Sequence, residues 1–254
     1  MSIHRSLEQD TNYLVDTCAR NFKFNKQITD HIFHCKDHRD LDMDLIEREF
    51  QVNCTASMIY RVTDICVPAG VMNETASHTR ALDQKLKSLY RHSQMPIEIS
   101  SFFGSHEALL HDMRRSPSVN SLKHGITGEC YKFVCSTTDQ HMDRRKVKSR
   151  VDEEIVARGL ARLLEEDDSV SILTFDKDVS YILNCVASEL SNRRLVRGNN
   201  VAYSWINEKL HDQGIYVAKP NRLECEKDAI KLMKPKIMAR TSKFLLNLDR
   251  YRHR

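Results

Sequence analysis

The sequence predicts an α/β protein built around a mostly parallel sheet. Four short apolar or β-branched segments are typical of strands: residues 12–17, 61–68, 169–175 and 214–220. Longer stretches with the apolar spacing of helices separate these segments. Strands that alternate with helices favour parallel pairing, because the connecting helix carries the chain back to the start of the next strand.

Turn residues and charges mark the ends of the predicted strands. NYLVDT (12–17) ends with an aspartate and a threonine, and RVTDICVP (61–68) stops at a proline. SVSILTF (169–175) leads into two aspartates one residue apart, and GIYVAKP (214–220) runs from a glycine to a proline. Polar side chains therefore fall at the carboxyl ends of the predicted strands.

Six stretches have helical periodicity. They are residues 43–50, 69–92, 151–168, 178–190, 199–213 and 225–248. Pro68 suits the first turn of the second helix, and Pro235 is expected to break or kink the last one. Residues 93–145 show no clean period and are predicted to form an irregular insertion. We therefore expect one domain over residues 1–220, followed by a basic helical extension at 221–254.

The composition is that of an ordinary globular protein. The chain has 254 residues, of which 41% are hydrophobic and 29% are charged. No apolar run approaches the roughly 18 residues that a membrane span needs, and the N-terminus lacks the apolar stretch of a signal peptide. We expect a cytoplasmic protein without a membrane partner, whose eight scattered cysteines stay reduced.

Two segments concentrate positive charge, although the net charge is only +4. Residues 219–254 contain eleven Lys or Arg against four Asp or Glu, and residues 144–150 contain five basic residues and no acid. Such segments favour a polyanionic partner. A solvated helix face is the alternative interpretation for either segment alone.

Acidic residues gather where a parallel sheet forms its sites. Asp16 follows one predicted strand, and Asp176 and Asp178 follow another. Glu74 lies about one and a half turns into a helix, and Asp152 opens a further helix. Each has a structural alternative as a turn residue, a helix cap or an exposed helical acid. Their joint placement at one edge of the sheet instead favours a carboxylate cluster.

The predicted carboxylate cluster needs a compensating cation, because neighbouring carboxylates raise one another's pKa. Mg²⁺ and Mn²⁺ compensate such charge through oxygen ligands and ordered water. An acidic metal site flanked by basic segments suits a phosphodiester. Basic side chains bind the backbone, while the metal activates water and stabilises the leaving oxygen.

The four acid-bearing segments, taken in order, resemble those of the PIN-domain nucleases. They are YLVDT, ICVPAGVMNET, VDEEIVARGLA and ILTFDKD, and they span roughly residues 11–220. The resemblance implies a three-layer α/β/α sandwich with a mostly parallel central sheet. It also implies a metal-dependent endoribonuclease that cleaves single-stranded RNA with one or two Mg²⁺ or Mn²⁺ ions.

The resemblance also assigns roles to single residues. The catalytic, metal-binding acids would be Asp16, Glu74, Asp152 and Asp176. Asp178 would be a further ligand or would support one, Thr174 would orient a carboxylate or water, and Glu153 is the alternative to the third acid. Two features depart from the family pattern. Arg20 brings a charge soon after the first acid, and the gap between the second and third acids is longer.

The basic segment before the third acid is expected to hold the RNA backbone through Arg144, Arg145, Lys146 and Lys148. Expected partners are single-stranded RNA or a structured RNA such as a tRNA, a regulatory protein such as an antitoxin, and a second copy of the chain. Two alternatives stay open: a non-catalytic scaffold of the same fold that binds RNA or protein, and a structure-specific DNA nuclease.

Two clusters contain the ligand types of zinc sites. His31, Cys35 and His38 lie at i, i+4 and i+7, and Cys130 and Cys135 lie together in a second segment. Neither cluster has four ligands at standard spacing. The sequence therefore does not decide whether either one binds zinc.

Overall fold

The computed structural model describes residues 12–21, 26–62, 65–116, 125–141, 150–165, 170–191, 214–219 and 240–242. Four strands, two 3₁₀ helices and seven α-helices lie within these ranges. Their order is β1 (Asn12–Val15), η1 (Thr17–Ala19), α1 (Lys26–His34), η2 (His38–Asp40), α2 (Met43–Val62), α3 (Ala69–Leu89), α4 (Ile97–Arg115), α5 (Gly125–His141), α6 (Val151–Glu165), β2 (Val170–Leu173), α7 (Lys177–Ser191), β3 (Ile215–Lys219) and β4 (Arg240–Ser242).

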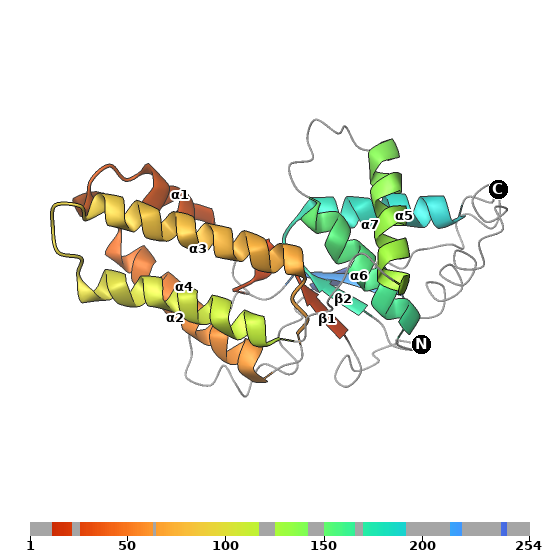
Figure 1. Ribbon diagram of the computed structural model, residues 1–254, viewed down its shortest axis with the longest axis horizontal. Helices are drawn as coiled ribbons and strands as arrows, with labels where there is room; N and C mark the ends of the chain where they lie inside the picture. Colours follow the sequence, from red (N-terminus) through yellow and green to blue (C-terminus); the bar gives the residue numbers. More distant parts are fainter. Residues whose placement is uncertain are drawn as a thin grey trace.

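A helical bundle and a small sheet occupy opposite ends of an elongated molecule. Helices α1 to α4 pack together at one end, while β1, β2 and α5 to α7 lie at the other (Figure 1). Each end has its own hydrophobic cluster, one around Ile99 and Phe102 and one around Leu14 and Ile172. Among the described helices, none is both long and apolar enough to cross a membrane.

The strands follow the order β1-β2-β3-β4. The first three are parallel, with Leu14 opposite Ile172 and Ile172 opposite Val217. β4 pairs with β3 in the antiparallel direction. Cys66 adds one isolated parallel bridge to Leu14. The carboxyl ends of β1 and β2 therefore lie side by side.

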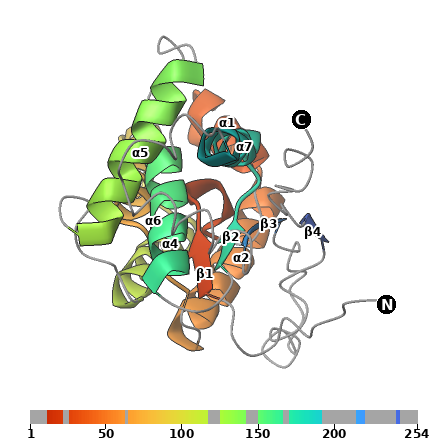
Figure 2. The same ribbon diagram turned by 90° about the vertical axis from the view of Figure 1, so that its right-hand side faces the viewer.

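The expectation of a three-layer α/β/α sandwich around a mostly parallel central sheet is wrong. Helices make up most of the described residues, and each strand has only three to five residues. α6 packs on the sheet, and α5 and α7 pack on α6 (Figure 2). The chain is mostly helical, with a small sheet at one end. The sequence misled because α4 and α5 were not recognised as helices, and because local patterns do not determine how helices pack around a sheet.

Three of the four predicted strands form, in shortened versions. β1, β2 and β3 lie inside the predicted segments 12–17, 169–175 and 214–220. The segment 61–68 instead begins as the last turn of α2 and contributes the isolated bridge from Cys66. The described part of the predicted second strand therefore forms only this single bridge beside β1, and residues 63–64 lie outside the described residues.

α2 runs for 20 residues, where the sequence predicted a helix only over 43–50. Its buried face includes polar side chains, which interrupt the apolar period. Asn53 donates from Nδ2 to the hydroxyl of Ser105 on α4 at 3.1 Å, and Thr55 donates to the carbonyl of Gln51 at 2.9 Å. These hydrogen bonds let the helix bury polar groups that a hydropathy pattern places in solvent.

The segment 93–145 is not an irregular insertion, because it contains α4 and α5. α4 buries a helical stripe that includes Ile99, Phe102, His106, Leu109 and Met113. α5 buries three threonines beside Phe133 and Val134, so its apolar period is weak. Small polar residues on buried faces therefore concealed helices from the sequence pattern.

Several expectations fall outside the described residues. They include the helix at 199–213 and most of the helix at 225–248. Within the predicted extension at 221–254, the structure describes only Arg240–Ser242, which forms β4 rather than helix. The division between a domain at 1–220 and an extension stays a prediction.

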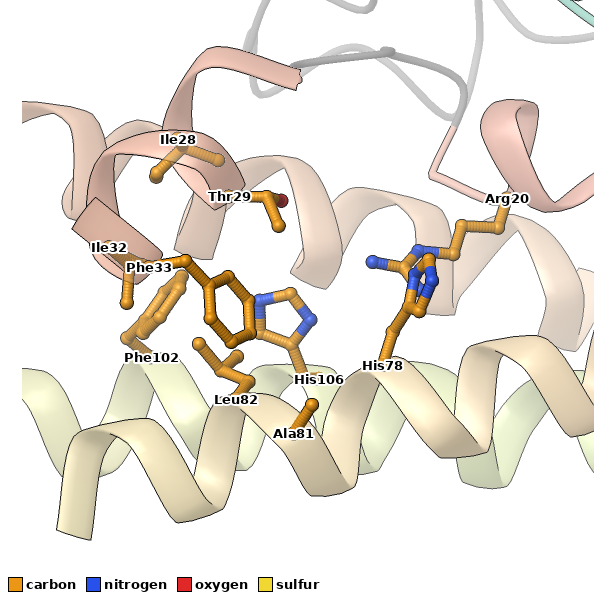
Figure 3. A pocket seen from close by; sticks show the side chains of 10 residues that line it. All are labelled: Arg20, Ile28, Thr29, Ile32, Phe33, His78, Ala81, Leu82, Phe102 and His106. Carbon is orange, nitrogen blue, oxygen red and sulfur yellow. The ribbon is translucent and has the colours of Figure 1, made fainter. Parts of the chain in front are cut away.

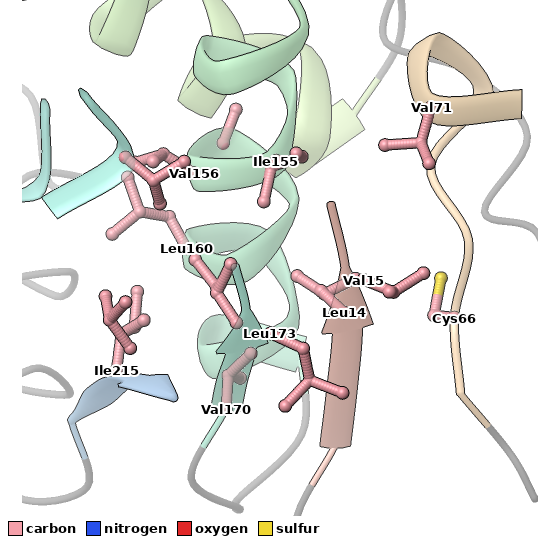
Figure 4. Packing of buried hydrophobic residues seen from close by; sticks show 14 of the residues in the cluster. Leu14, Val15, Cys66, Val71, Ile155, Val156, Leu160, Val170, Leu173 and Ile215 are labelled. Carbon is pink, nitrogen blue, oxygen red and sulfur yellow. The ribbon is translucent and has the colours of Figure 1, made fainter. Parts of the chain in front are cut away.

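The core beneath the strand ends is formed by α6 and the sheet (Figure 4). Leu14 and Leu160 are fully buried in it. Gly159 brings α6 close to the strands, because a Cβ at this position would lie 3.4 Å from Ile172 and 3.6 Å from Ile215. This packing places the first turn of α6 near the carboxyl end of β2.

Candidate metal site

Asp16 lies just beyond β1, and its backbone N–H donates to the carbonyl of Leu173 at 3.0 Å. Its side chain is only 4% exposed. Oδ2 accepts two hydrogen bonds, from the Thr174 hydroxyl at 2.6 Å and from the Cys18 thiol at 2.9 Å. Burial raises the pKa of Asp16, while these two donors act in the opposite direction. The two strand ends thus hold this carboxylate in a fixed orientation.

Asp152, Asp176 and Asp178 come together from two segments of the chain. Asp152 is in the first turn of α6, Asp176 lies between β2 and α7, and Asp178 is in the first turn of α7. One carboxylate oxygen from each lies within 4.8 Å of the others. In the described part of the chain, this is the one group of three His, Cys, Asp or Glu side chains that could hold a metal ion.

The turn between β2 and α7 fixes two of these acids through the backbone. The N–H of Asp176 donates to the Thr174 hydroxyl at 2.9 Å. The N–H of Asp178 donates to Oδ1 of Asp176, also at 2.9 Å. Asp176 therefore caps the start of α7, where the helix dipole favours negative charge. The capping role and a role as a metal ligand are compatible, because a carboxylate has two oxygens.

Burial and the charges of neighbouring acids set the protonation of Asp152. Its burial, followed by the charges of Asp16, Asp176, Glu153 and Asp178, raises its pKa to about 7. Among the described residues, no lysine or arginine forms an ion pair with the aspartates of this cluster. Asp152 thus holds a proton for much of the time at neutral pH, unless a cation compensates its charge.

Glu74 reaches the site indirectly. Its Oε2 accepts a hydrogen bond from the hydroxyl of Thr17 at 2.7 Å, and Thr17 follows Asp16 in the chain. Glu74 does not belong to the group of three aspartates. The structure therefore links Glu74 to Asp16 through Thr17 and places it beside the cluster rather than within it.

The two glutamates that follow the α6 aspartate have other contacts. Glu153 is 2% exposed, and its Oε1 lies 3.7 Å from Nη1 of Arg150. Glu154 accepts from Nε of Arg158 at 2.9 Å and from the N–H of Gly70 at 3.0 Å. Asp152 is thus the acid of this run that meets the other aspartates. Glu154 joins α6 to the start of α3.

Cys18 is a part of the site that the sequence did not predict. Its thiol contacts Asp16, and its sulfur accepts the N–H of Phe175 at 3.2 Å. Burial and the Asp16 charge raise the pKa of Cys18 to about 12, so the thiol stays neutral and donates. Cys18 and Thr17 directly follow Asp16 in the sequence, and this adjacency was the available signal.

The two histidine and cysteine clusters, for which the sequence left zinc binding open, are not among the groups of three or more possible metal ligands in the described part of the chain. Nε2 of His31 accepts the N–H of Asp42 at 2.9 Å, and the sulfur of Cys35 lies 3.7 Å from the same nitrogen. The His38 ring packs against Tyr90, with centroids 5.0 Å apart. Cys130 and Cys135 both lie on α5, and neither forms a disulfide. The histidine and cysteine contacts have structural explanations.

The aspartate cluster fits a hard divalent cation. Its donors are carboxylate oxygens, which Mg²⁺ and Mn²⁺ prefer, and the one thiol at the site keeps its proton. Burial, followed by the charges of neighbouring acids, raises the pKa of Asp152, and a bound cation would act in the opposite direction. An ion would bind through Asp152, Asp176 and Asp178, with Asp16 near enough to act on their charge.

The predicted RNA-binding residues Arg144, Arg145, Lys146 and Lys148 lie outside the described residues. Comparisons with protein-family models, with curated proteins and with solved structures found no match to this chain. Function must therefore be argued from the chemistry of the site.

Proposed function

We propose that the chain is a metal-dependent endonuclease that hydrolyses phosphodiester bonds, with single-stranded RNA as its substrate. One observation carries the proposal. Asp152, Asp176 and Asp178 bring oxygens within 4.8 Å of one another, next to the buried Asp16. Like charges at this separation destabilise the fold unless a cation binds among them. An arrangement of this kind is suited to holding a divalent ion against a phosphate.

Each acid has a distinct task in this proposal. Asp152, Asp176 and Asp178 would hold the ion, since their oxygens converge. Asp16 is oriented by its donors from Thr174 and Cys18 and adds negative charge behind the ion. A bound Mg²⁺ or Mn²⁺ would activate water and offset the charge of the phosphate oxygens.

Glu74 acts on the site indirectly, through Thr17. Its hydrogen bond to Thr17 fixes the turn that follows Asp16. We propose that Glu74 positions this turn, and with it Asp16, through Thr17. Loss of Glu74 should therefore reduce cleavage less than loss of Asp176.

The choice of RNA rests on the basic segments and on the resemblance to PIN-domain nucleases. Arg144, Arg145, Lys146 and Lys148 would hold phosphates next to the site. A cytoplasmic location, a homodimer and a regulatory protein such as an antitoxin belong to the same proposal. Electrostatic binding of this kind predicts affinity for RNA that falls steeply as salt rises.

A cleavage assay with matched substrates tests the proposal. The full chain would be incubated with end-labelled single-stranded RNA, single-stranded DNA of the same sequence, and a DNA flap, each with Mn²⁺ or with a chelator. Asp16→Asn and Asp176→Asn should reduce RNA cleavage at least about a hundredfold. Glu107→Gln, an exposed acid on α4, should cleave like the wild type.

The outcomes separate the alternatives. Cleavage of the DNA flap in preference to RNA would indicate a structure-specific DNA nuclease. RNA binding without cleavage by any preparation would indicate a non-catalytic scaffold. Full activity in both aspartate variants, at matched purity, would mean that the activity does not come from this cluster.

A further inference from the structure

A cavity of about 280 Å³ lies within the helical bundle, apart from the aspartate cluster. It is enclosed by α1, α3 and α4, with Arg20 entering from the turn that follows η1 (Figure 3). Apolar side chains form most of its wall, including Phe33, Leu82 and Phe102. Ligand pockets usually have volumes of about 300–1,000 Å³, so this cavity lies just below the usual range and has room only for a small molecule.

Arg20 brings a guanidinium donor without a hydrogen-bond acceptor to the cavity. Its Nη1 is buried and has no hydrogen-bond partner, and among the described residues no carboxylate lies within 4.0 Å of its guanidinium. The charge of Glu49 partly offsets that of Arg20, but Glu49 does not line the cavity, and its Oε1 accepts from Nδ2 of Asn21 at 2.7 Å. A buried guanidinium donor without an acceptor is costly, and an anionic ligand would remove that cost.

His106 adds a second unpartnered polar group. Its side chain is 8% exposed, and its Nε2 has no hydrogen-bond partner. The ring packs edge-on against Phe102, with centroids 4.9 Å apart. Burial and the charge of Arg20 lower the pKa of His106 to about 3, so the ring stays neutral and can donate one hydrogen bond.

The charges around the cavity select the ligand. Burial and Arg20 also lower the pKa of His78, so the two imidazoles lining the cavity are neutral and Arg20 supplies one positive charge. A singly charged head group matches this arrangement. A phosphate monoester would bring a second negative charge, for which the described lining residues offer no second cation.

We propose that this cavity binds a small monocarboxylate with an apolar body of one or two rings. The carboxylate would pair with Arg20 and accept from His106, and the rings would pack against Phe33, Leu82 and Phe102. The two histidines and the guanidinium lie at the same cavity as these apolar groups, as a site for an amphipathic acid requires. This inference is independent of the proposed nuclease activity.

Binding of 2-naphthoate to the full chain, followed by its fluorescence and by calorimetry, tests the proposal. The neutral 2-naphthamide and the doubly charged 1-naphthyl phosphate serve as comparison probes. Benzoate, with one ring instead of two, tests which size of ring system the cavity accepts. We expect saturable binding of 2-naphthoate or benzoate at one site. The amide and the phosphate should each bind at least about tenfold more weakly than the corresponding carboxylate.

Three variants locate the site. Arg20→Gln should weaken carboxylate binding about tenfold or more, because it removes the charged donor. Ala81→Phe should block binding by filling the cavity while it keeps Arg20. Arg80→Gln, an exposed arginine on the same helix as Ala81, should bind like the wild type. Circular dichroism and thermal melting would first establish that each variant is folded.

Specific results would overturn the proposal. They are the absence of saturable binding by both carboxylates, equal binding of amide and carboxylate, tighter binding of the phosphate, or unchanged binding in folded Ala81→Phe. If Arg20→Gln does not fold, the Ala81→Phe variant and the amide comparison still decide the outcome.

Discussion

The hydroxyl of Thr174 donates a 2.6 Å hydrogen bond to Oδ2 of Asp16, across 158 positions of sequence. The same hydroxyl accepts the N–H of Asp176 at 2.9 Å. One buried side chain therefore connects the end of β1 to the turn that carries Asp176. The orientation of the Asp16 carboxylate and the position of the turn that carries Asp176 therefore depend on the same hydroxyl.

Replacing Thr174 by valine should destabilise the protein by about 1–3 kcal/mol. Valine keeps the shape but removes the donor to a buried carboxylate and the acceptor for a backbone N–H. Thr174→Ser keeps the hydroxyl and loses only a methyl group. The free energy of unfolding should therefore fall less in this variant than in Thr174→Val. Urea unfolding of both variants measures the difference. A Thr174→Val protein as stable as Thr174→Ser would show that the hydroxyl contributes nothing.

Cys18 should react slowly with thiol reagents in the folded protein. Its pKa of about 12 instead of 9.0 lowers the thiolate fraction near pH 8 by roughly a thousandfold. Mass spectrometry after iodoacetamide treatment measures the labelling of this residue before and after unfolding. Asp16→Asn removes the charge that raises the pKa, so Cys18 should then react faster. Rapid labelling in the folded wild type would contradict the assigned protonation.

Gly70→Ala should destabilise the protein by about 2–4 kcal/mol. A Cβ at this position would lie 2.5 Å from Oε2 of Glu154, which accepts the Gly70 N–H. Moving this carboxylate away would also disturb the hydrogen bond from Nε of Arg158 to its Oε1. Gly104→Ala is the matched control, because its Cβ would meet nothing within 4 Å. In a helix interior that change should be neutral or stabilising by up to about 1 kcal/mol. Equal unfolding midpoints for the two variants would rule out the close contact.

Asp152 should make stability fall as pH rises. The unfolded chain releases this proton near the ordinary pKa of 3.8, whereas the folded chain keeps it up to about 7. Between these values the folded state binds more protons, so the wild type should lose stability relative to Asp152→Asn from about pH 4 to about pH 7. Above this window the difference should level off. Urea unfolding of both proteins across the window measures it, and a difference that is constant or rises with pH would contradict the raised pKa.

The sequence predicted the aspartates better than the architecture around them. Asp176 and Asp178 follow a strand that does form, and Asp152 opens a helix that does form, so these three acids were placed at the correct element ends. Asp16 follows β1 and lies beside them, whereas Glu74 stays outside their group. The sandwich was wrong because it required the placement of whole helices relative to the sheet. Local periodicity contains little information about such long-range packing.

Buried polar residues account for the other errors. Asn53 and the buried threonines of α5 look solvent-exposed in a hydropathy pattern, and so α2 was predicted too short and α5 was missed. The cavity at Arg20 and His106 could not be predicted for a different reason. Its walls come from separate helices and from the turn after η1, and only the folded chain brings them together.

Calorimetric titration of Mn²⁺ into the full chain tests the central claim most directly. The wild type should bind Mn²⁺ saturably, and Asp152→Asn and Asp176→Asn should each weaken binding at least about tenfold, because each removes a charged oxygen ligand. Glu107→Gln, outside the cluster, should bind like the wild type. Absence of Mn²⁺ binding by the wild type, or equal binding by all four proteins, would contradict a metal site at these aspartates.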